Sequence, residues 1–450
     1  MKYALLLLAL LTPFFVLDAG EARKPNVVLI LADDLGYGDL GCYGGKVIPT
    51  PNLDRMAREG MRFTQAYAGS AVCAPSRCAL MTGMHTGHGQ VRANTQVGPE
   101  GQQPLESGTL TLAGVLKQAG YRTGAFGKWG LGGPGSSGEP SRVGFDEFFG
   151  YLDQALAHEY YPPMLRRHSE AVPMDGKTYS HGAIFDAALE FVRKSGSTPF
   201  FLYLPVCLPH GKLDVPDAAA FAEKRWSQPL KNYAAMVALL DRDVGRLLEV
   251  VDENTVVFFA SDNGPEVVYF QKLVPEYIRE LHSNGPLRGF KRDLYEGGIR
   301  VPLIVRWPGK VKPGVSGHVC AFWDFLPTLA ELVGQNLPEA GDGISFAPTL
   351  LGVPGQREHS HLYWEFHERG FAQAVRFGDW KAIKRGPDAA VELFDLGQDL
   401  GERVDLAGRH PDHVARALAL FGSSRTESPA IQLKSTVIRG SGYADFRDEP

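Results

Sequence analysis

The sequence predicts an α/β fold, with a large, mostly parallel sheet flanked by helices on both faces, followed by a smaller antiparallel sheet with one helix. Continuous apolar, β-rich runs at Asn26–Ala32, Pro199–Pro205 and Thr255–Ala260 are typical of strands buried on both faces of a parallel sheet. Segments of helical period alternate with these runs along the chain. The pattern changes near Gly341–Gly343, beyond which short strands and turns predominate.

The elements of the first unit can be assigned in chain order. Proline is favoured in the first turn of a helix and glycine at its end, so Pro75 predicts a helix start and Gly83 its stop. The other elements follow from apolar periodicity. They are helices at Asn52–Gly60, Leu110–Gly120, Ser180–Lys194 and Asn232–Val251, and strands at Arg122–Gly127 and Val301–Trp307.

The C-terminal unit is predicted to be a small α+β subdomain. Its strands are expected at His361–Glu368, Phe371–Phe377, Trp380–Lys384 and Ala390–Asp395, and its helix at Pro411–Phe421. The tail from Ser423 onward is polar and without periodicity. The length of 450 residues suits one large domain with an appendage, or two domains, and we expect units at residues 23–345 and 346–450.

The N-terminal residues 1–22 have the pattern of a secretory signal peptide. Lys2 precedes an apolar core at Ala4–Leu17, and the small residues Ala19 and Ala22 follow. The core is too short for a stable membrane span, and no later stretch is long and apolar enough to cross a bilayer. We therefore expect an exported protein, periplasmic or secreted, with no integral membrane segment.

Charge and cysteine content exclude several classes of function. The net charge is −5, and no basic run indicates a nucleic-acid partner. The chain has 5 cysteines with irregular spacing and no Cys-x-x-Cys pair, which argues against a zinc site or a dense disulfide framework. Any pairing among them stays open. They are Cys42, Cys73, Cys78, Cys207 and Cys320.

Polar side chains recur just past the ends of the predicted strands. Open α/β sheets bind ligands at the carboxyl ends of their strands, so segments far apart in sequence should meet there. The residues concerned are Asp33, Asp34, Lys128, His210, Asp262 and Asn263. This pattern predicts one site at one edge of the sheet.

The stretch around Cys73 carries the most specific signal. A cysteine before a helix could be a small buried apolar residue, or a low-pKa thiolate with a histidine base. Cys73-x-Pro75-Ser76-Arg77, continued by Leu-x-Thr-Gly83, resembles the signature of the type I sulfatases. The resemblance implies an alkaline-phosphatase-like fold and oxidation of Cys73 to formylglycine by a maturation enzyme. It also implies that Arg77 holds the formylglycine hydrate.

The acid and amide pairs at two strand ends are candidate metal ligands. Singly, Asp33-Asp34 could form a turn or cap, and Asp262-Asn263 a tight turn. Together they offer the hard oxygen ligands that calcium or magnesium prefers. The sulfatase resemblance makes these four residues, with the modified Cys73, the ligands of a divalent cation, usually calcium.

Three further motifs imply sulfate-binding groups. Gly127-Lys128-Trp129-Gly130-Leu-Gly132 resembles the family segment Gly-Lys-Trp-His-Leu-Gly, whose lysine binds sulfate, but this chain has Gly130 in place of the histidine. His210 resembles the family histidine that contacts sulfate or protonates the leaving oxygen; a capping or core histidine is the alternative. Lys291, ahead of Tyr-Glu-Gly-Gly, resembles the second sulfate-binding lysine, although Arg292 leaves open which cation points inward.

A second set could recognise the organic part of the substrate. Planar polar groups and carboxylates suit sugar hydroxyls, and the polar, aromatic loop around residues 154–162 is of this type. His158 could replace the histidine absent at 130. The candidates are His85, His88, Arg92, Asn94, Gln154, His158, Glu365 and His367.

The resemblance extends from Pro25 to about Pro429 and implies hydrolysis of a sulfate ester, which we expect on a sulfated saccharide. An exo-acting enzyme for galactose or N-acetylgalactosamine sulfate is the first expectation. A phosphonate monoester or phosphodiester hydrolase of the same fold is one alternative. A non-catalytic carbohydrate-binding relative is another.

Overall fold

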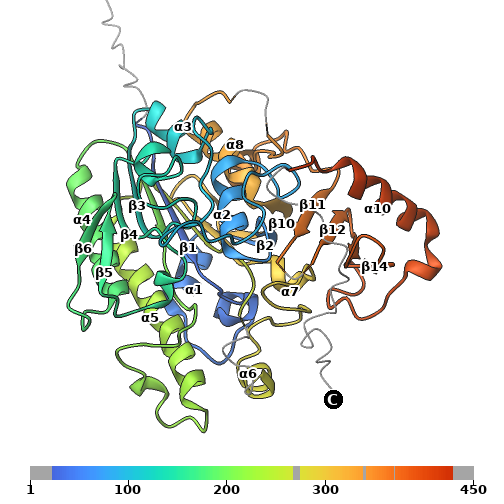
Figure 1. Cartoon of the computed structure of the whole chain (residues 1–450), viewed down its shortest axis with the longest axis horizontal. Coiled ribbons are helices and arrows are strands. Elements are labelled where there is room, and N and C mark those ends of the chain that lie inside the picture. Colours follow the sequence, from blue (N-terminus) through green and yellow to red (C-terminus); the bar gives the residue numbers. More distant parts are fainter. Residues whose placement is uncertain (1–22, 267–273, 338–340, 369, 429–450) are drawn as a thin grey trace, which may run out of the picture.

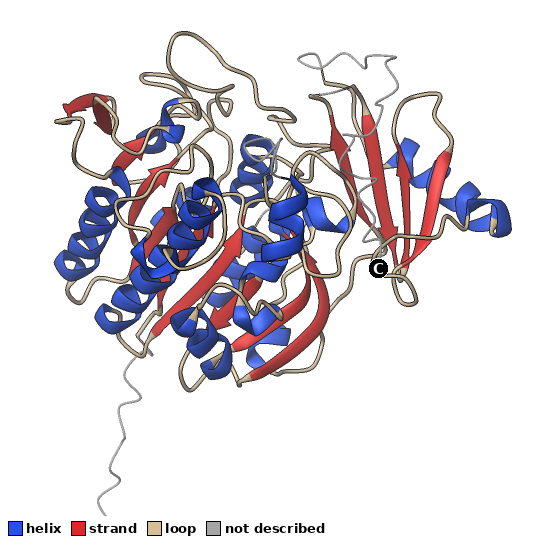
Figure 2. Ribbon diagram, turned by 90° about the horizontal axis from the view of Figure 1, so that it is seen from below, coloured by secondary structure: helices blue, strands red, loops and turns tan. Residues whose placement is uncertain are grey.

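The computed structural model describes residues 23–266, 274–337, 341–368 and 370–428 (Figure 1). The predicted signal peptide and the tail from residue 429 lie outside the described residues. Two sheets are present, one of ten strands and one of four. Figures 1 and 2 show them side by side, with the small sheet and its helix at one end of the molecule. The large sheet and the smaller sheet that were predicted are therefore both seen, while the division into units at residues 23–345 and 346–450 stays a prediction.

The large sheet has the order β10-β2-β9-β8-β1-β7-β3-β4-β5-β6. The pairs β8–β1, β1–β7, β7–β3, β3–β4 and β10–β2 are parallel, whereas β9 is antiparallel to both of its neighbours. Its strands are β1 (Asn26–Ala32), β2 (Met61–Tyr67), β3 (Arg122–Lys128), β4 (Glu147–Tyr151), β5 (Met164–Arg167), β6 (Glu170–Pro173), β7 (Phe200–Pro205), β8 (Thr255–Ser261), β9 (Leu303–Arg306) and β10 (Gly314–Ala321).

Helices cover both faces of this sheet (Figure 2). Val28 and Ile30 of β1 belong to the core on one face, and Val27 and Leu29 belong to the core on the other. This alternation shows why the strand is apolar throughout. The first core includes α1 (Pro51–Glu59), α4 (Ser180–Ser195) and α5 (Gln228–Val250); the second includes α2 (Cys73–Thr82), α3 (Leu112–Gln118) and α8 (Phe325–Leu332).

The small sheet is antiparallel, as predicted. It has the order β11-β12-β13-β14, and Ala417 and Phe421 of the last helix pack in its core. Its elements are β11 (Leu362–Phe366), β12 (Ala372–Phe377), β13 (Trp380–Lys384), β14 (Val391–Asp395) and α10 (Pro411–Ser423). Three short helices complete the fold: α6 (Val274–Leu281), α7 (Glu296–Ile299) and α9 (Ala347–Leu351).

The structure differs from the sequence prediction where strands are short or polar. β2, β4, β5, β6 and β10 were not predicted, because their sequences lack a long apolar run; β6 and the first half of β10 are largely exposed. The helix at the cysteine motif begins at Cys73 rather than at Pro75. All five cysteines are free thiols. Among the described residues, no helix combines the length and apolar character needed to span a bilayer.

Candidate active site

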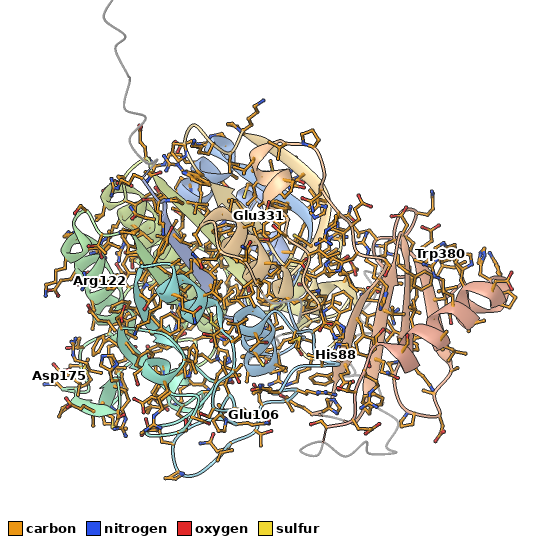
Figure 3. All side chains as sticks on the ribbon, turned by 90° about the horizontal axis from the view of Figure 1, so that it is seen from above. His88, Glu106, Arg122, Asp175, Glu331 and Trp380 are labelled. Atoms are coloured by element: carbon orange, nitrogen blue, oxygen red, sulfur yellow. The ribbon has the colours of Figure 1, made fainter. Side chains whose placement is uncertain are left out.

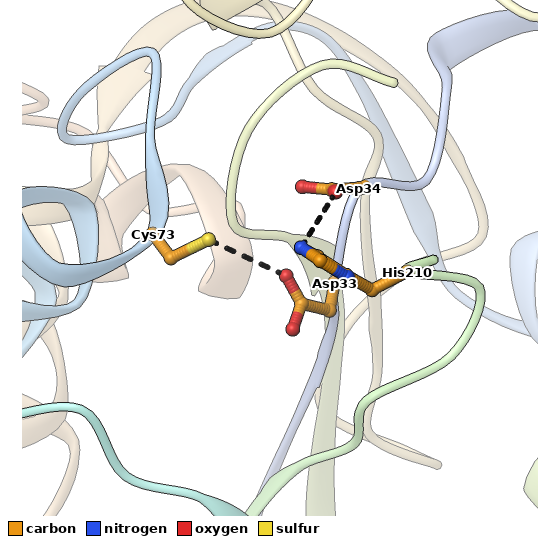
Figure 4. A group of neighbouring side chains, drawn as sticks. All are labelled: Asp33, Asp34, Cys73 and His210. Carbon is orange, nitrogen blue, oxygen red and sulfur yellow. Dashed lines mark hydrogen bonds and ion pairs between the residues drawn. The ribbon is translucent and has the colours of Figure 1, made fainter. Parts of the chain in front are cut away.

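Four strands that are neighbours in the large sheet end at one edge and carry the predicted polar residues. In the order β8-β1-β7-β3, Asp262 follows the first strand, Asp33 the second and His210 the third, and Lys128 ends the fourth. These strands are mutually parallel, so their carboxyl ends coincide. The predicted convergence of distant segments is confirmed (Figure 4).

Cys73 is the first residue of α2, and its thiol points at this edge. The Sγ atom lies 3.6 Å from Asp33 Oδ1 and 3.4 Å from Lys128 Nζ. The side chain is buried, and burial raises the pKa of the thiol to about 12. An unmodified Cys73 would therefore stay protonated at neutral pH, which argues against the thiolate alternative. Its position beside the acid cluster also argues against a purely structural cysteine.

Arg77 links α2 to two strands of the sheet. Its Nε and Nη2 donate to Asp262 Oδ2 at 3.1 and 2.7 Å, and its Nη1 donates to the Lys128 carbonyl at 2.6 Å. The guanidinium is fully buried, and the planar fork suits this two-bond contact. Ser76 adds a hydrogen bond from its hydroxyl to the Asp262 carbonyl at 2.5 Å. The helix that carries Cys73 is thereby fixed against β8.

Two buried lysines form ion pairs with the two aspartates that follow β1. Lys128 Nζ is 2.6 Å from Asp33 Oδ2, and Lys291 Nζ is 2.7 Å from Asp34 Oδ1. Burial alone would lower the pKa of each lysine, but the aspartate beside it and the other acidic neighbours together outweigh burial and raise the pKa. Burial likewise would raise the pKa of Asp33, but Lys128 and its other cationic neighbours lower it well below the usual value. Both lysines are thus available as cations.

The same region has a donor set suited to a divalent cation. Ligand atoms of Asp33, Asp34, Cys73 and His210 lie within 4.8 Å of one another. Asn263 donates from Nδ2 to Asp34 Oδ1 at 2.7 Å, and its own Oδ1 is buried without a hydrogen-bond partner. Rotating this amide by 180° would exchange its oxygen and nitrogen and direct the oxygen toward Asp34. The rotated amide would then offer a bound cation an oxygen next to the Asp34 carboxylate, and such oxygens are the ligands that calcium prefers.

Two of the clustered acids have raised pKa values because they are buried. Burial raises the pKa of Asp34 to about 6, with Asp33 adding to the effect and Lys291 opposing it. Burial also raises the pKa of Asp262 to about 6. Asp34 has a positive φ of 65°, a strained conformation for a residue with a side chain. A divalent cation would stabilise the ionised carboxylates, so the residues present fit the predicted ion.

Two histidine rings stack at the edge of this cluster. The ring centroids of His158 and His210 are 4.0 Å apart. His210 Nδ1 is hydrogen-bonded to the Gly211 carbonyl, which makes this nitrogen the donor, and Nε2 lies 3.3 Å from Asp34 Oδ2. Burial lowers the pKa of His210 well below its usual value, and Lys291 contributes. Burial, with His210, lowers the pKa of His158 to about 2.

Three residues of the predicted substrate-binding set lie next to the acid cluster. Asn94 Oδ1 accepts from the Ala74 amide at 3.0 Å, directly beside Cys73. Gln154 is 7% exposed and its Nε2 has no hydrogen-bond partner. A Cβ at Gly130 would lie 2.7 Å from that Nε2, so Gln154 fills the space of a side chain at 130. His158, stacked on His210, is the third.

The other five residues of that set lie between the large and the small sheet, where they contact one another or Asp342. His88 Nδ1 is 2.8 Å from Asp342 Oδ1, and Figure 3 shows His88 where the larger body meets the small sheet. His85 stacks on His88, with ring centroids 4.5 Å apart. Glu365 lies 2.9 Å from both Arg92 Nη1 and His367 Nε2. These contacts join the loop after α2 to β11, and a role in substrate binding stays a prediction for these five.

The sequence left open whether Lys291 or Arg292 points into the site, and Glu266 was not among the predicted site residues. Lys291 is the inward cation, whereas Arg292 is 22% exposed on its side chain and pairs with Glu266. Glu266 is buried, with its Oε2 3.9 Å from Lys291 Nζ. Its position three residues after Asn263 was the available signal, because the turn that carries the predicted ligands continues into it.

Comparisons with known proteins agree with this geometry. Residues 25–335 match the family model described as Sulfatase, and residues 289–417 match one described as N-sulphoglucosamine sulphohydrolase, C-terminal. The chain is 34% identical to arylsulfatase A of Homo sapiens, over 92% of this chain and 93% of that protein. It is 29% identical to N-acetylgalactosamine-6-O-sulfatase of Bacteroides thetaiotaomicron, over 91% of this chain and 95% of that protein.

Solved structures give the same result. The crystal structure of Ps i-CgsB in complex with k-i-k-neocarrahexaose superposes with a TM-score of 0.78. The two sequences are 29% identical, and the match covers 90% of this chain and 94% of the other.

Proposed function

The chain belongs to the sulfatase family and is a sulfuric ester hydrolase, and from this premise we propose that its substrate is a sulfated saccharide. The observation that carries the proposal is the contact of Cys73 Sγ with Asp33 and Lys128 at the edge where β8, β1, β7 and β3 end. A nucleophile precursor, hard oxygen ligands and buried cations meet there, as cleavage of an anionic ester requires.

We propose that Cys73 is oxidised to formylglycine by a maturation enzyme. The hydrated aldehyde supplies one hydroxyl as nucleophile and a second hydroxyl whose proton loss releases sulfate. We further propose that Asp33, Asp34, Asp262 and Asn263 hold calcium, with magnesium as the alternative, and that the cation makes the hydrate hydroxyl more acidic. The residues present suit this role because they supply carboxylate and amide oxygens.

The remaining residues have complementary tasks in this proposal. Lys128 and Lys291 bind sulfate oxygens and neutralise the charge that develops as the S–O bond breaks. Arg77, fixed by Asp262, orients the hydrate through charge-assisted hydrogen bonds. His210 keeps the proton on Nδ1 because that nitrogen donates to the Gly211 carbonyl, so Nε2 would deliver a proton to the leaving oxygen only after taking one up, as the imidazolium that the bound anionic ester would favour.

Recognition of the sugar is assigned to the candidates beside the cluster. Gln154 offers an unpaired amide donor, Asn94 bonds to the Ala74 amide beside Cys73, and His158 stacks on His210. The relatives include an N-acetylgalactosamine-6-O-sulfatase, which supports a galactose-type or N-acetylgalactosamine sulfate and exo action. His85, His88, Arg92, Glu365 and His367 would support this region from the small-sheet side. Export to the periplasm or medium is consistent with such a substrate.

The test uses the full-length enzyme coexpressed with a formylglycine-generating enzyme. Peptide mass spectrometry should show residue 73 lighter than cysteine by about 18 Da, and Cys73→Ala should lose at least about 1,000-fold in kcat on an aryl sulfate. Cys78→Ala, on the same helix, is the matched control and should keep its activity.

Two results would contradict the proposal. Faster turnover of a matched aryl phosphonate than of the aryl sulfate would favour the phosphonate hydrolase alternative. An unmodified thiol at residue 73 after coexpression, with saccharide binding but no turnover, would favour the non-catalytic alternative. A panel of defined sulfated saccharides then identifies the sugar and the sulfated position.

A further inference from the structure

A surface hollow of ≈570 Å³ lies outside the site described above, at the opposite edge of the large sheet. It is lined by the end of α1, the start of β2 and the start of β10, with Arg58, Arg62 and Val315 among its walls. In the sheet, β9 is antiparallel to β8, and Arg306 pairs with Val257 near the start of β8. Arg62 of the hollow pairs with Ile304 of β9, which pairs with Phe259 of β8, and Asp262 lies three residues beyond Phe259. The two regions are therefore about 10 Å apart along the strands and about 10 Å apart across them.

The charges around this hollow are predominantly positive. Glu59 pairs with Arg306 at 2.6 Å, whereas Arg58 and Arg62 form no ion pair with any described residue. The Arg62 guanidinium lies 5.0 Å from the centroid of the Tyr43 ring, which restrains its position.

One acid also lines the hollow. Asp54 Oδ1 accepts from the Cys42 amide at 2.7 Å and from the Thr50 hydroxyl at 3.3 Å. Its carboxylate is thus engaged with the adjoining loop, and it forms no ion pair with the two arginines among the described residues. The N–H groups of the two guanidinium groups can therefore donate to a bound ligand. A planar guanidinium can bind a sulfate group through two parallel hydrogen bonds.

We propose that this hollow is a second, non-catalytic binding site for the sulfate groups of a polymeric saccharide substrate. The proposal rests on the proposed function, because it takes its ligand from the same polymer. Size and chemistry both fit: ligand sites commonly measure about 300–1,000 Å³. The exposed Val315 offers an apolar contact for the carbon face of a sugar ring. Binding there holds the enzyme on the polymer and raises the local concentration of substrate ends.

This role has a consequence that separates it from catalysis. The hollow lies at the sheet edge opposite to Cys73, so a small substrate in the active site does not reach it. Disruption of the hollow should therefore change the KM for a polymer and leave the turnover of a small aryl sulfate unchanged. Because exposed charges are screened by salt, the polymer effect should shrink as ionic strength rises.

The experiment compares Arg58→Glu/Arg62→Glu with the matched control Arg193→Glu/Lys194→Glu, which makes the same charge change at the exposed end of α4. The matured full-length enzymes are assayed on an aryl sulfate and on a sulfated galactan at low and high salt. We expect the hollow variant to keep its aryl sulfatase kcat/KM within about twofold. Its KM for the galactan should rise roughly tenfold at low salt, whereas the control should keep both its aryl sulfatase kcat/KM and its galactan KM.

Binding is measured separately, with the inactive Cys73→Ala enzyme on immobilised sulfated galactan, desulfated galactan and double-stranded DNA. The proposal expects retention on the sulfated galactan alone, abolished by the hollow substitutions. Equal retention on DNA, equal loss in the control variant, or an unchanged galactan KM would overturn it. Failure of the saccharide proposal would look different, since aryl sulfate would be hydrolysed while no saccharide in the panel released sulfate.

Discussion

Among the buried charged residues that the structure describes, two groups differ in how their members are paired. The catalytic cluster consists of Asp33, Asp34, Asp262, Arg77, Lys128 and Lys291. The joint cluster, where the small sheet meets the large one, consists of Glu296, Glu402, Arg300, Arg376 and Lys381. Both mix acids with cations in a region without solvent, where an unpaired charge is costly.

The joint cluster is closed by contacts between its own members. Lys381 Nζ of β13 lies 2.9 Å from Glu296 Oε1 and 3.0 Å from Glu402 Oε1. Glu296 Oε2 accepts from the Tyr67 hydroxyl at 2.7 Å and from Arg300 Nη1 at 3.0 Å. Burial opposes ionisation of Glu296, but Lys381 and Arg300 outweigh it and lower its pKa to about 2. Glu296 is thus a fully compensated buried charge.

The catalytic cluster keeps part of its bonding capacity unused. Asn263 Oδ1 has no partner, Asp34 is strained, and the pKa values of Asp34 and Asp262 are both raised to about 6 by burial. The two clusters are connected through α7, since Gly264 donates its amide to the Gly298 carbonyl at 3.0 Å. Glu402 of the joint cluster also has a raised pKa, but it contacts Lys381 of the same cluster. The partnerless oxygen of Asn263 and the strain at Asp34 support the proposal that the catalytic cluster binds a cation.

The largest expected effect comes from Asp262→Asn. This change keeps the shape of the side chain but removes a charge that faces Arg77 and the proposed cation. We expect kcat on an aryl sulfate to fall at least about 1,000-fold, because removal of even an indirect metal partner costs up to about 100-fold. Calcium affinity, measured by isothermal titration calorimetry on the folded variant, should fall in parallel.

Asp243→Asn is the matched control for that variant. Asp243 is also a buried aspartate paired with a cationic group, but it lies on α5 beside His181. It should lose stability without losing calcium affinity. If the Asp262 variant bound calcium normally, the metal assignment would be wrong.

The second effect concerns stability and tests the joint cluster. Lys381→Met leaves Glu296 and Glu402 facing each other without their shared cation. Breaking a buried pair typically costs about 3–5 kcal/mol, and we expect the lower end because one acid can take up a proton. Denaturant unfolding of wild type and variant measures this loss. A loss below about 1 kcal/mol, the range of exposed pairs such as Lys194–Glu190, would show that the joint is not a stabilising element.

The two clusters also differ in how far they could be predicted. Asp33 and Asp262 directly follow apolar strands, Lys128 ends one, and His210 lies in the loop after another, so the strand order was enough to predict that they meet. Cys73 was identified from a local motif. In contrast, Lys381 lies in Trp380–Lys384, a correctly predicted strand on which a lysine would be expected to face solvent. Its burial arises from the packing of two sheets, which no local pattern encodes.

The same reasoning applies to the parts of the fold that were missed. Strands β2 and β10 are mixed in polarity because they lie toward one side of the large sheet, where burial is incomplete. Tertiary pairing rather than apolar periodicity defines them. The loop residues His85 and Arg92 were predicted to bind substrate, and this role stays a prediction. Their partners Asp342 and Glu365 are more than 250 positions away in sequence, so no local pattern indicates these contacts.

The smallest effect we predict is a pH dependence located at Glu402. Burial raises the pKa of this carboxyl to about 7, with Glu296 adding to the effect and Lys381 opposing it. The ordinary value is 4.5, so between about pH 4.5 and 7 the folded protein holds a proton that the unfolded chain releases. Stability from this group is therefore present below pH 4.5 and is lost as pH rises toward 7. Glu402→Gln cannot titrate and should lack this slope.

The measurement is denaturant unfolding of both proteins at pH 5 and pH 8. Asp34 and Asp262 titrate in the same range, so only the difference between wild type and variant reports on Glu402. Wild type should lose about 1–3 kcal/mol more than Glu402→Gln between these pH values, since one pKa unit corresponds to about 1.4 kcal/mol. The exposed Glu223→Gln should leave the slope unchanged. If the free energy of unfolding changed equally with pH in wild type and Glu402→Gln, Lys381 would be keeping both glutamates ionised. The joint cluster would then add no pH dependence to stability over the range in which Asp34 and Asp262 of the catalytic cluster titrate.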